Sequence, residues 1–248
     1  MSDFQLIILL TLALGAGGLV KGVTGMGLPL VAIPILAAFL GIAHAVAIVM
    51  MPILVTNAWQ LWQLRDELKR LRFLGPLLAA GSVGVFVGVW VLTTVPERAL
   101  SVVLAVILFL YIGLRLAKPD FRIPAGPGYA LAAPAGFVAG VLQGATGISS
   151  PVGVTFIHAL REPRRAHIAA VSAMFLVFVI FHIPALLFAG IFTWERFVQS
   201  SFAILPAAAA MPLGTFLSSR LSQVGFDRLI LALLAIIAVQ LMSKGAGY

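Results

Sequence analysis

The sequence predicts an all-α polytopic membrane protein, and three observations lead to this class. Of the 248 residues, 62% are hydrophobic and only 10% are charged. A water-soluble domain of this composition would have too few polar side chains to cover its surface. Apolar stretches of membrane-spanning length recur along the whole chain, and the Lys and Arg residues lie mostly at their ends.

Eight apolar elements follow one another, and most of them have about the 20 residues that a membrane helix needs. They are residues 4–43, 45–64, 73–93, 99–116, 129–160, 168–189, 197–217 and 226–242. The charged segments between them are short. No linker therefore divides the chain, and residues 1–248 are predicted to form a single membrane domain.

The first and fifth elements are too long for one membrane helix. Residues 129–160 would be about 48 Å long as a continuous helix, against a hydrocarbon core of about 30 Å. Each long element either crosses once with an unwound middle or turns there and returns to the same side. If both return, 12 Lys and Arg residues lie on the cytoplasmic side and three outside, whereas crossing gives 9 and 6. The positive-inside rule therefore favours two helical hairpins.

A glycine-rich motif lies in the middle of each long element. The first copy comprises Gly18, Lys21, Gly22, Thr24, Gly25 and Pro29, and the second, 122 residues later, comprises Gly140, Gln143, Gly144, Thr146, Gly147 and Pro151. With two hairpins, each half makes three net crossings, so the second half is inverted. The predicted fold is two inverted-topology repeats, residues 1–118 and 123–248, each with one broken helical hairpin plus three transmembrane helices.

The motif has the chemistry of an anion site. Pro29 and Pro151 are predicted helix breaks, because proline lacks an N–H and favours the first turn of a helix. A half-helix that begins inside the membrane presents unpaired N–H groups and the positive end of its dipole, and both attract a small anion. Two such motifs are predicted to meet near the membrane midplane. The alternative is that the glycines only allow helices to pack closely.

The predicted substrate-binding residues come from both copies of the motif and one further helix. They are Lys21, Gly22, Thr24, Gly25, Gly27, Asn57, Gln143, Gly144, Thr146, Gly147, Ser149 and Ser150. The hydroxyl groups lie beside the break, although Ser149 or Ser150 is alternatively a helix cap. Lys21 is the one basic residue inside an apolar element, where a charge is costly and usually functional, or else snorkels to an interface.

Other polar residues within the apolar elements have two interpretations. Asn57 shares a helical face with Gln60, and hydrogen bonding between helices is the alternative to substrate binding. His182 is a candidate proton relay or a buried histidine bonded to a carbonyl. Because the apolar elements contain no buried carboxylate, energy coupling is left open. His44 and His167 are predicted to lie in loops.

No catalytic residue, metal site or cofactor is predicted. The eight acidic residues lie almost entirely at loop edges, no metal-binding spacing of His and Glu occurs, and the chain has no cysteine. The segment after Gly147 lacks the nucleophile elbow of a hydrolase. The basic residues are topology signals, so no nucleic acid is expected. The expected partners are a small anionic substrate and the lipid bilayer, and a homo-oligomer is left open.

At its duplicated motif the chain resembles the sulfite exporter TauE/SafE family of integral membrane proteins. The matching segments are Gly18-Leu-Val-Lys-Gly-Val-Thr-Gly-Met-Gly-Leu-Pro29 and Gly140-Val-Leu-Gln-Gly-Ala-Thr-Gly-Ile-Ser-Ser-Pro151. The resemblance covers essentially the whole chain. It implies a multi-pass secondary transporter of the bacterial inner membrane that exports sulfite or organosulfonates. The alternatives are a passive anion channel of the same fold and a membrane assembly protein that transports nothing.

The two copies differ at two positions that matter for an anion. Lys21 of the first copy corresponds to Gln143 in the second, and Gly27 corresponds to Ser149. The residues alone predict a small anion, and only the resemblance indicates a sulfur oxyanion. The exact anion and the direction of transport are left open.

Overall fold

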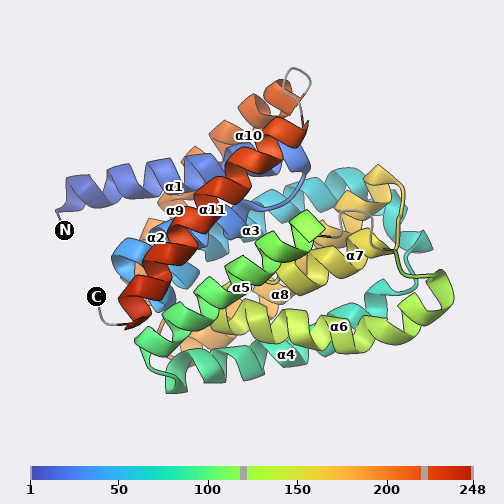
Figure 1. The fold of residues 1–248 in the computed structure, drawn as a ribbon, viewed down its shortest axis with the longest axis horizontal. Coiled ribbons are helices and arrows are strands. Elements are labelled where there is room, and N and C mark those ends of the chain that lie inside the picture. The colour runs from blue at the N-terminus through green and yellow to red at the C-terminus, as the bar shows by residue number, and fades with distance from the viewer. Residues whose placement is uncertain (1, 118–121, 219–222, 247–248) are drawn as a thin grey trace. The chain divides into compact units, whose positions relative to one another are not determined.

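The computed structural model describes residues 2–117, 122–218 and 223–246, and all regular structure within these ranges is helical (Figure 1). The elements are α1 (Asp3–Thr24), α2 (Leu28–Leu40), α3 (Ile42–Leu64), η1 (Arg65–Arg70), α4 (Leu74–Thr94), α5 (Glu97–Ala117), α6 (Ala125–Thr146), η2 (Ser150–Val154), α7 (Thr155–Ala159), α8 (Arg164–Phe188), α9 (Trp194–Phe202), α10 (Ile204–Ser218) and α11 (Gln223–Ala246).

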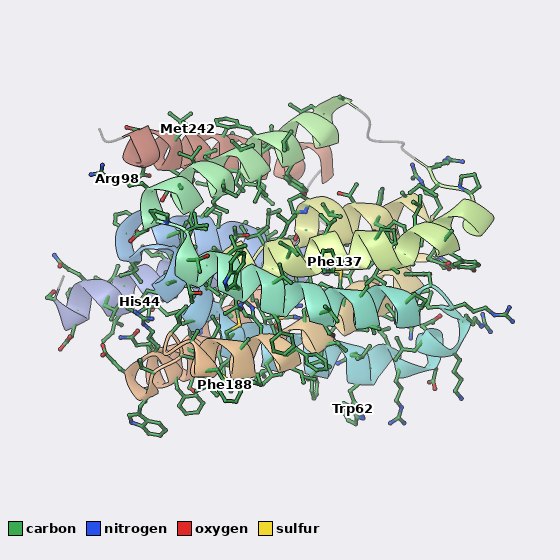
Figure 2. All side chains as sticks on the ribbon, turned by 90° about the horizontal axis from the view of Figure 1, so that it is seen from below. His44, Trp62, Arg98, Phe137, Phe188 and Met242 are labelled. Carbon is green, nitrogen blue, oxygen red and sulfur yellow. The ribbon has the colours of Figure 1, made fainter. Side chains whose placement is uncertain are left out.

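Five helical segments within these ranges are long and apolar enough to cross a membrane. They are Asp3–Thr24, Ile42–Arg70, Leu74–Thr94, Arg164–Phe188 and Trp194–Ser218. Large apolar side chains lie on the outside: Trp90 and Trp194 are 65% and 77% exposed, and Phe188 is 92% exposed. Figure 2 shows Trp62 and Phe188 at the outer edge of their helices. Such a surface suits lipid and not water. The predicted class, an all-α polytopic membrane protein, is confirmed.

The helices form two compact units. Unit 1 contains Met1–Pro52, Val95–Gly113 and Ile191–Tyr248, and unit 2 contains Ile53–Thr94 and Leu114–Gly190. The chain passes between the units four times, and two of these passages lie inside helices, after Pro52 in α3 and after Gly113 in α5. Each unit thus combines segments of both predicted repeats. The boundary predicted between the repeats falls mainly on residues 118–121, outside the described residues, and the inverted relation of the repeats stays a prediction.

In unit 1, glycines of α1 allow close contact with α10. A Cβ atom on Gly18 would collide with the backbone of Ala207, and one on Gly22 would collide with the backbone of Met211. Conversely, a Cβ on Gly214 would collide with the backbone of α1. Small residues let two membrane helices approach until their backbones touch, and this contact stabilises the pair through van der Waals packing. α2 packs against both α1 and α11.

In unit 2, α4 and α6 lie side by side (Figure 1) and are joined by glycines from both helices. These glycines are Gly81, Gly84 and Gly88 of α4 and Gly136, Gly140 and Gly144 of α6, and at each of them a Cβ would meet backbone atoms of the other helix. α8 packs on α4, where the ring of Phe178 fills the space over Gly81. The glycine spacing thus determines which helix packs against α1 and which packs against α6, the two helices that carry the motif.

Within unit 1, α3 is held to α9 at a proline. Pro52 has no N–H, so the carbonyl of Ile48 loses its usual helical partner. The hydroxyl of Ser200 donates to this carbonyl at 2.7 Å and accepts from the N–H of Met51 at 3.0 Å. Nearby, His44 Nε2 lies 2.6 Å from the side-chain oxygen of Gln199. His44 therefore lies in the first turn of α3, and its predicted loop position is wrong.

Candidate functional site

Both copies of the motif end a helix in the same way. Gly25 follows α1 and Gly147 follows α6, with left-handed φ angles of +79° and +73°. Each glycine N–H donates to the carbonyl four residues earlier, that of Lys21 or Gln143, at 2.7 Å. Because side chains with a Cβ rarely adopt this conformation, the local structure requires glycine at both positions.

The threonine of each copy stabilises the helix end. The Thr24 hydroxyl donates to the Val20 carbonyl at 2.9 Å, and the Thr146 hydroxyl donates to the Leu142 carbonyl at 2.8 Å. Each hydroxyl also accepts a hydrogen bond from the N–H two residues further on, at 3.2 Å and 3.3 Å. The hydroxyl protons thus already have acceptors inside the helix. Substrate binding by these threonines stays a prediction.

Beyond each break the chain turns back along the helix it has left. Pro29 lies in the first turn of α2. A Cβ on Gly17 of α1 would lie 3.3 Å from the Ala32 Cβ of α2. In the second copy, a Cβ on Gly153 would lie 3.1 Å from the Ala139 Cβ of α6. Both interrupted elements are therefore hairpins.

The second hairpin is closed at both ends. Pro151 lies in the first turn of η2, next to the break. At the base, the N–H of Ile123 donates to the carbonyl of Ala159 at 2.9 Å. The returning arm, η2 and α7, is held between α6 and α8: a Cβ on Gly153 would also lie 2.5 Å from the Met174 sulfur of α8. The arm is therefore fixed by contacts on two sides.

The two breaks differ in the residue before the returning arm. Gly27 has a left-handed φ of +96°, whereas Ser149 has φ −94° and ψ −8°, which any residue adopts. The second break therefore accepts a serine, and it is followed by a π-helical turn, Ser150–Val154. In this turn the N–H of Gly153 donates to the Ser149 carbonyl at 2.8 Å. Turns of this type occur often at functional sites.

Four buried polar side chains of unit 2 lie at the second break or on the helix packed against it, and we call them the polar cluster: Gln143, Ser149, Ser150 and His182. All are at most 3% exposed. Neither amide atom of Gln143 and neither serine hydroxyl has a hydrogen-bond partner among the described residues. The His182 ring lies beside the backbone of Gly144, but neither of its nitrogens has hydrogen-bond geometry to a described residue. In the same part of the chain, no backbone hydrogen bond is donated by the N–H of Ser149 or Ser150. An unpaired buried polar group costs about 1–3 kcal/mol, so such groups normally bind water or a ligand.

The four residues of the cluster belong to three segments, or lie next to them, and these segments pack against one another: α6, η2 and α8. Ala139 faces the returning arm at Gly153, and Gln143 lies on the same face of α6 one turn closer to the break. Because the arm is antiparallel to α6, the arm residues one turn closer to the break are the two serines. α8 contacts both α6 and η2, and the backbone of Gly144 lies next to the His182 ring. The arrangement supplies several hydrogen-bond donors and contains no charged side chain.

The remaining predicted site residues have other surroundings. Gly22 and Gly144 face the backbones of α10 and α4, so their immediate role is helix packing. Lys21 is buried at 2% exposure in unit 1, four residues after the contact between α1 and α2 at Gly17. Asn57 is also buried, and its amide nitrogen donates to the Ile53 carbonyl at 2.7 Å. A substrate role for these residues, and a site shared by both breaks, stay predictions.

Two polar pairs of unit 2 join residues of different helices. Ser172 of α8 donates to the side-chain oxygen of Gln60 at 2.9 Å, which is the hydrogen bonding between helices that the sequence offered as the alternative for this face of α3; the second pair was not foreseen. His167 lies in α8 and is buried, with its ring 5.6 Å from that of His158 in a T-shaped arrangement, so its predicted loop position is wrong. No motif or spacing in the sequence indicates that His158 and His167 pack together, because a turn separates the helices that carry them. Within the ranges that the structure describes, no group of three or more metal-ligating side chains occurs.

Comparison with known proteins adds one finding. The family model described as Sulfite exporter TauE/SafE matches residues 9–241, which include both copies of the motif and both hairpins. No curated protein and no solved structure matches the chain.

Proposed function

Because the chain belongs to the sulfite exporter TauE/SafE family, we propose that it is a secondary transporter that exports sulfite or a small organosulfonate across the bacterial inner membrane. The family is one of membrane transporters and not of enzymes. The partners of the chain are accordingly a small anion and the membrane lipids. A homo-oligomer stays a prediction.

The observation that supports this function best is the polar cluster. An oxyanion accepts hydrogen bonds on each of its oxygens, and the cluster offers the amide of Gln143, the hydroxyls of Ser149 and Ser150, and an N–H of His182. The unpaired backbone N–H groups at the start of the returning arm add to these donors. Hydrogen bonds to a charged acceptor are stronger than neutral ones, so binding an anion would satisfy groups that are costly to leave unpaired.

In this proposal the second copy of the motif provides the main anion site. All the unpartnered buried side-chain atoms found in the described ranges lie in unit 2, and those at the break belong to the second copy. Thr24 and Thr146 stabilise the two breaks. Gly25 and Gly27 of the first copy, with Lys21, are proposed to contribute at another stage of transport. Rocking of one helical bundle against another is the usual mechanism of transporters with duplicated halves.

Flux into proteoliposomes tests the proposal. Purified protein is reconstituted, and the uptake of sulfite, sulfoacetate, taurine, thiosulfate, sulfate and acetate is measured with and without a pH gradient. Saturable movement of sulfite or a sulfonate, accelerated by the same anion on the opposite side, supports a carrier. High conductance without saturation supports a channel, and no movement of any anion by folded protein contradicts the proposal.

A matched pair of variants tests the site. Replacing Ser149 and Ser150 together by alanine removes two donors and should lower the affinity for the transported anion about tenfold or more. Ser218→Ala serves as the control, because Ser218 is half-buried at the end of α10 and its hydroxyl donates to the Thr215 carbonyl of its own helix. Equal transport by the double variant and the control would show that the serines do not bind the substrate.

A further inference from the structure

We propose that Gln143 makes the anion site selective for singly charged anions, so that sulfonates with no second acid group and hydrogen sulfite are bound and dianions such as sulfate are rejected. This inference rests on the proposed function and deepens it, because it assigns the charge of the substrate and names the residue that selects it. Its basis is the difference between the two copies of the motif.

The polar cluster is buried, and no charged side chain that the structure describes in unit 2 is buried with it. Each Lys, Arg, Asp and Glu side chain of unit 2 whose burial the structure describes is exposed or half-buried and lies in η1, at a helix end or in a turn. Among the side chains whose burial the structure describes, Lys21 of unit 1 is the single buried Lys, Arg, Asp or Glu. Within unit 2, an anion bound by the cluster would therefore be held by neutral donors.

Neutral donors favour a monoanion over a dianion. The cost of removing an ion from water rises with the square of its charge, whereas the attraction to fixed dipoles rises only in proportion to the charge. A second negative charge is therefore not compensated unless a cation is present. A sulfonate presents three oxygens with one charge and matches the available donors.

Gln143 is the position at which the two copies differ in charge. Gln143 and Lys21 occupy the same place in their hairpins, since each accepts the N–H of the left-handed glycine at 2.7 Å. Each also lies four residues after the residue that contacts the returning arm, Ala139 or Gly17. The first copy thus shows that a lysine side chain is accommodated at this place in the hairpin.

Binding of methanesulfonate and sulfate to the detergent-solubilised full chain tests the proposal. The two anions are both tetrahedral at sulfur and differ in charge. Isothermal titration should show methanesulfonate binding at least about tenfold more tightly than sulfate. In Gln143→Lys, the ratio of the two dissociation constants should shift toward sulfate by about tenfold or more, because the new charge attracts a dianion twice as strongly.

Two further variants make the result unambiguous. Gln143→Met keeps the length and removes the amide, so its affinity for methanesulfonate should fall about fivefold or more, while an unchanged affinity would overturn the role of Gln143. Gln63→Lys adds the same charge at an exposed position of α3 and should leave the ratio unchanged.

The wild-type ratio decides the proposal even where a variant does not fold. Sulfate binding as tightly as methanesulfonate would overturn the charge selectivity and leave the transporter assignment intact. Binding of neither anion, together with no flux of sulfite in proteoliposomes, would overturn the proposed function itself.

Discussion

Replacing Gly140 by alanine should force α4 and α6 apart and destabilise unit 2. The new Cβ would collide with the carbonyl oxygen of Gly81 and lie 2.7 Å from its carbonyl carbon. Carbon atoms in favourable contact are about 3.5–4.0 Å apart, so the backbones have to separate by about 1 Å. A backbone carbonyl cannot rotate away as a flexible side chain would, and separation at this point also loosens the neighbouring glycine contacts.

The magnitude follows from two opposing effects. Overpacking of this kind costs about 1–3 kcal/mol. Alanine is favoured over glycine inside a helix by about 0.5–1 kcal/mol, which offsets part of that cost. A net loss of about 1–2 kcal/mol remains. Since 1 kcal/mol shifts the melting temperature of a chain of this size by about 2–4 °C, we expect a decrease of about 2–8 °C.

Thermal unfolding in detergent, followed by tryptophan fluorescence, measures this decrease. Gly75→Ala is the matched control, because Gly75 also lies in α4 and a Cβ there would meet no atom within 4 Å. The control should melt at or slightly above the temperature of the unsubstituted protein. If Gly140→Ala and Gly75→Ala melt within about 1 °C of each other, close backbone contact is not the reason for glycine at position 140.

Three further substitutions should give different results in the same assay. Ser200→Ala leaves the Ile48 carbonyl of α3 unpaired and should cost about 1–3 kcal/mol. Gly147→Ala places a Cβ on left-handed backbone at the break and should cost about 1–2 kcal/mol, with reduced anion binding because the serines move. Arg165→Ala removes an exposed ion pair with Glu67 and should change the stability by less than about 1 kcal/mol.

Each of these results has a control or a contradicting outcome. Ser218→Ala removes a half-buried hydroxyl that bonds to its own helix end and should leave the melting temperature unchanged, in contrast to Ser200→Ala. Gly190 has a φ of +69° with open space around it, so Gly190→Ala should show the backbone cost without any effect on anion binding. A loss of more than about 2 kcal/mol in Arg165→Ala would mean that this ion pair is far stronger than an exposed pair normally is.

The helices were predictable from the sequence because their signals are local. Length and apolar composition indicate membrane helices, and a proline in a first turn or a left-handed glycine after a last turn marks an end. The predictions were wrong where a helix extends beyond its apolar stretch. α8 begins at Arg164, before its apolar part, and this placed His167 in a helix and not in a loop.

The candidate site was predictable only in part. Gln143, Ser149 and Ser150 were expected at a break, but His182 was expected only as a proton relay or a buried histidine, and the sequence did not indicate which of the two motifs has unpaired donors. It also did not show that the hydroxyl of Thr146 is bonded inside its own helix. Which polar groups remain unpaired depends on every neighbour that packs around them, and those neighbours come from distant parts of the chain.

The sequence by itself determined the membrane class, the order of the helices, the two breaks and the expectation of a small anion, since these depend on composition and on residues within one or two turns. The tertiary structure decided that both interrupted elements turn back, which helix each glycine face meets, and where unpaired donors gather. These features arise from contacts such as that of Gly140 with Gly81, or of Gly153 with Met174. Side chains far apart in the sequence come into contact only when the helices that carry them pack together. No local sequence pattern indicates how closely two such helices approach.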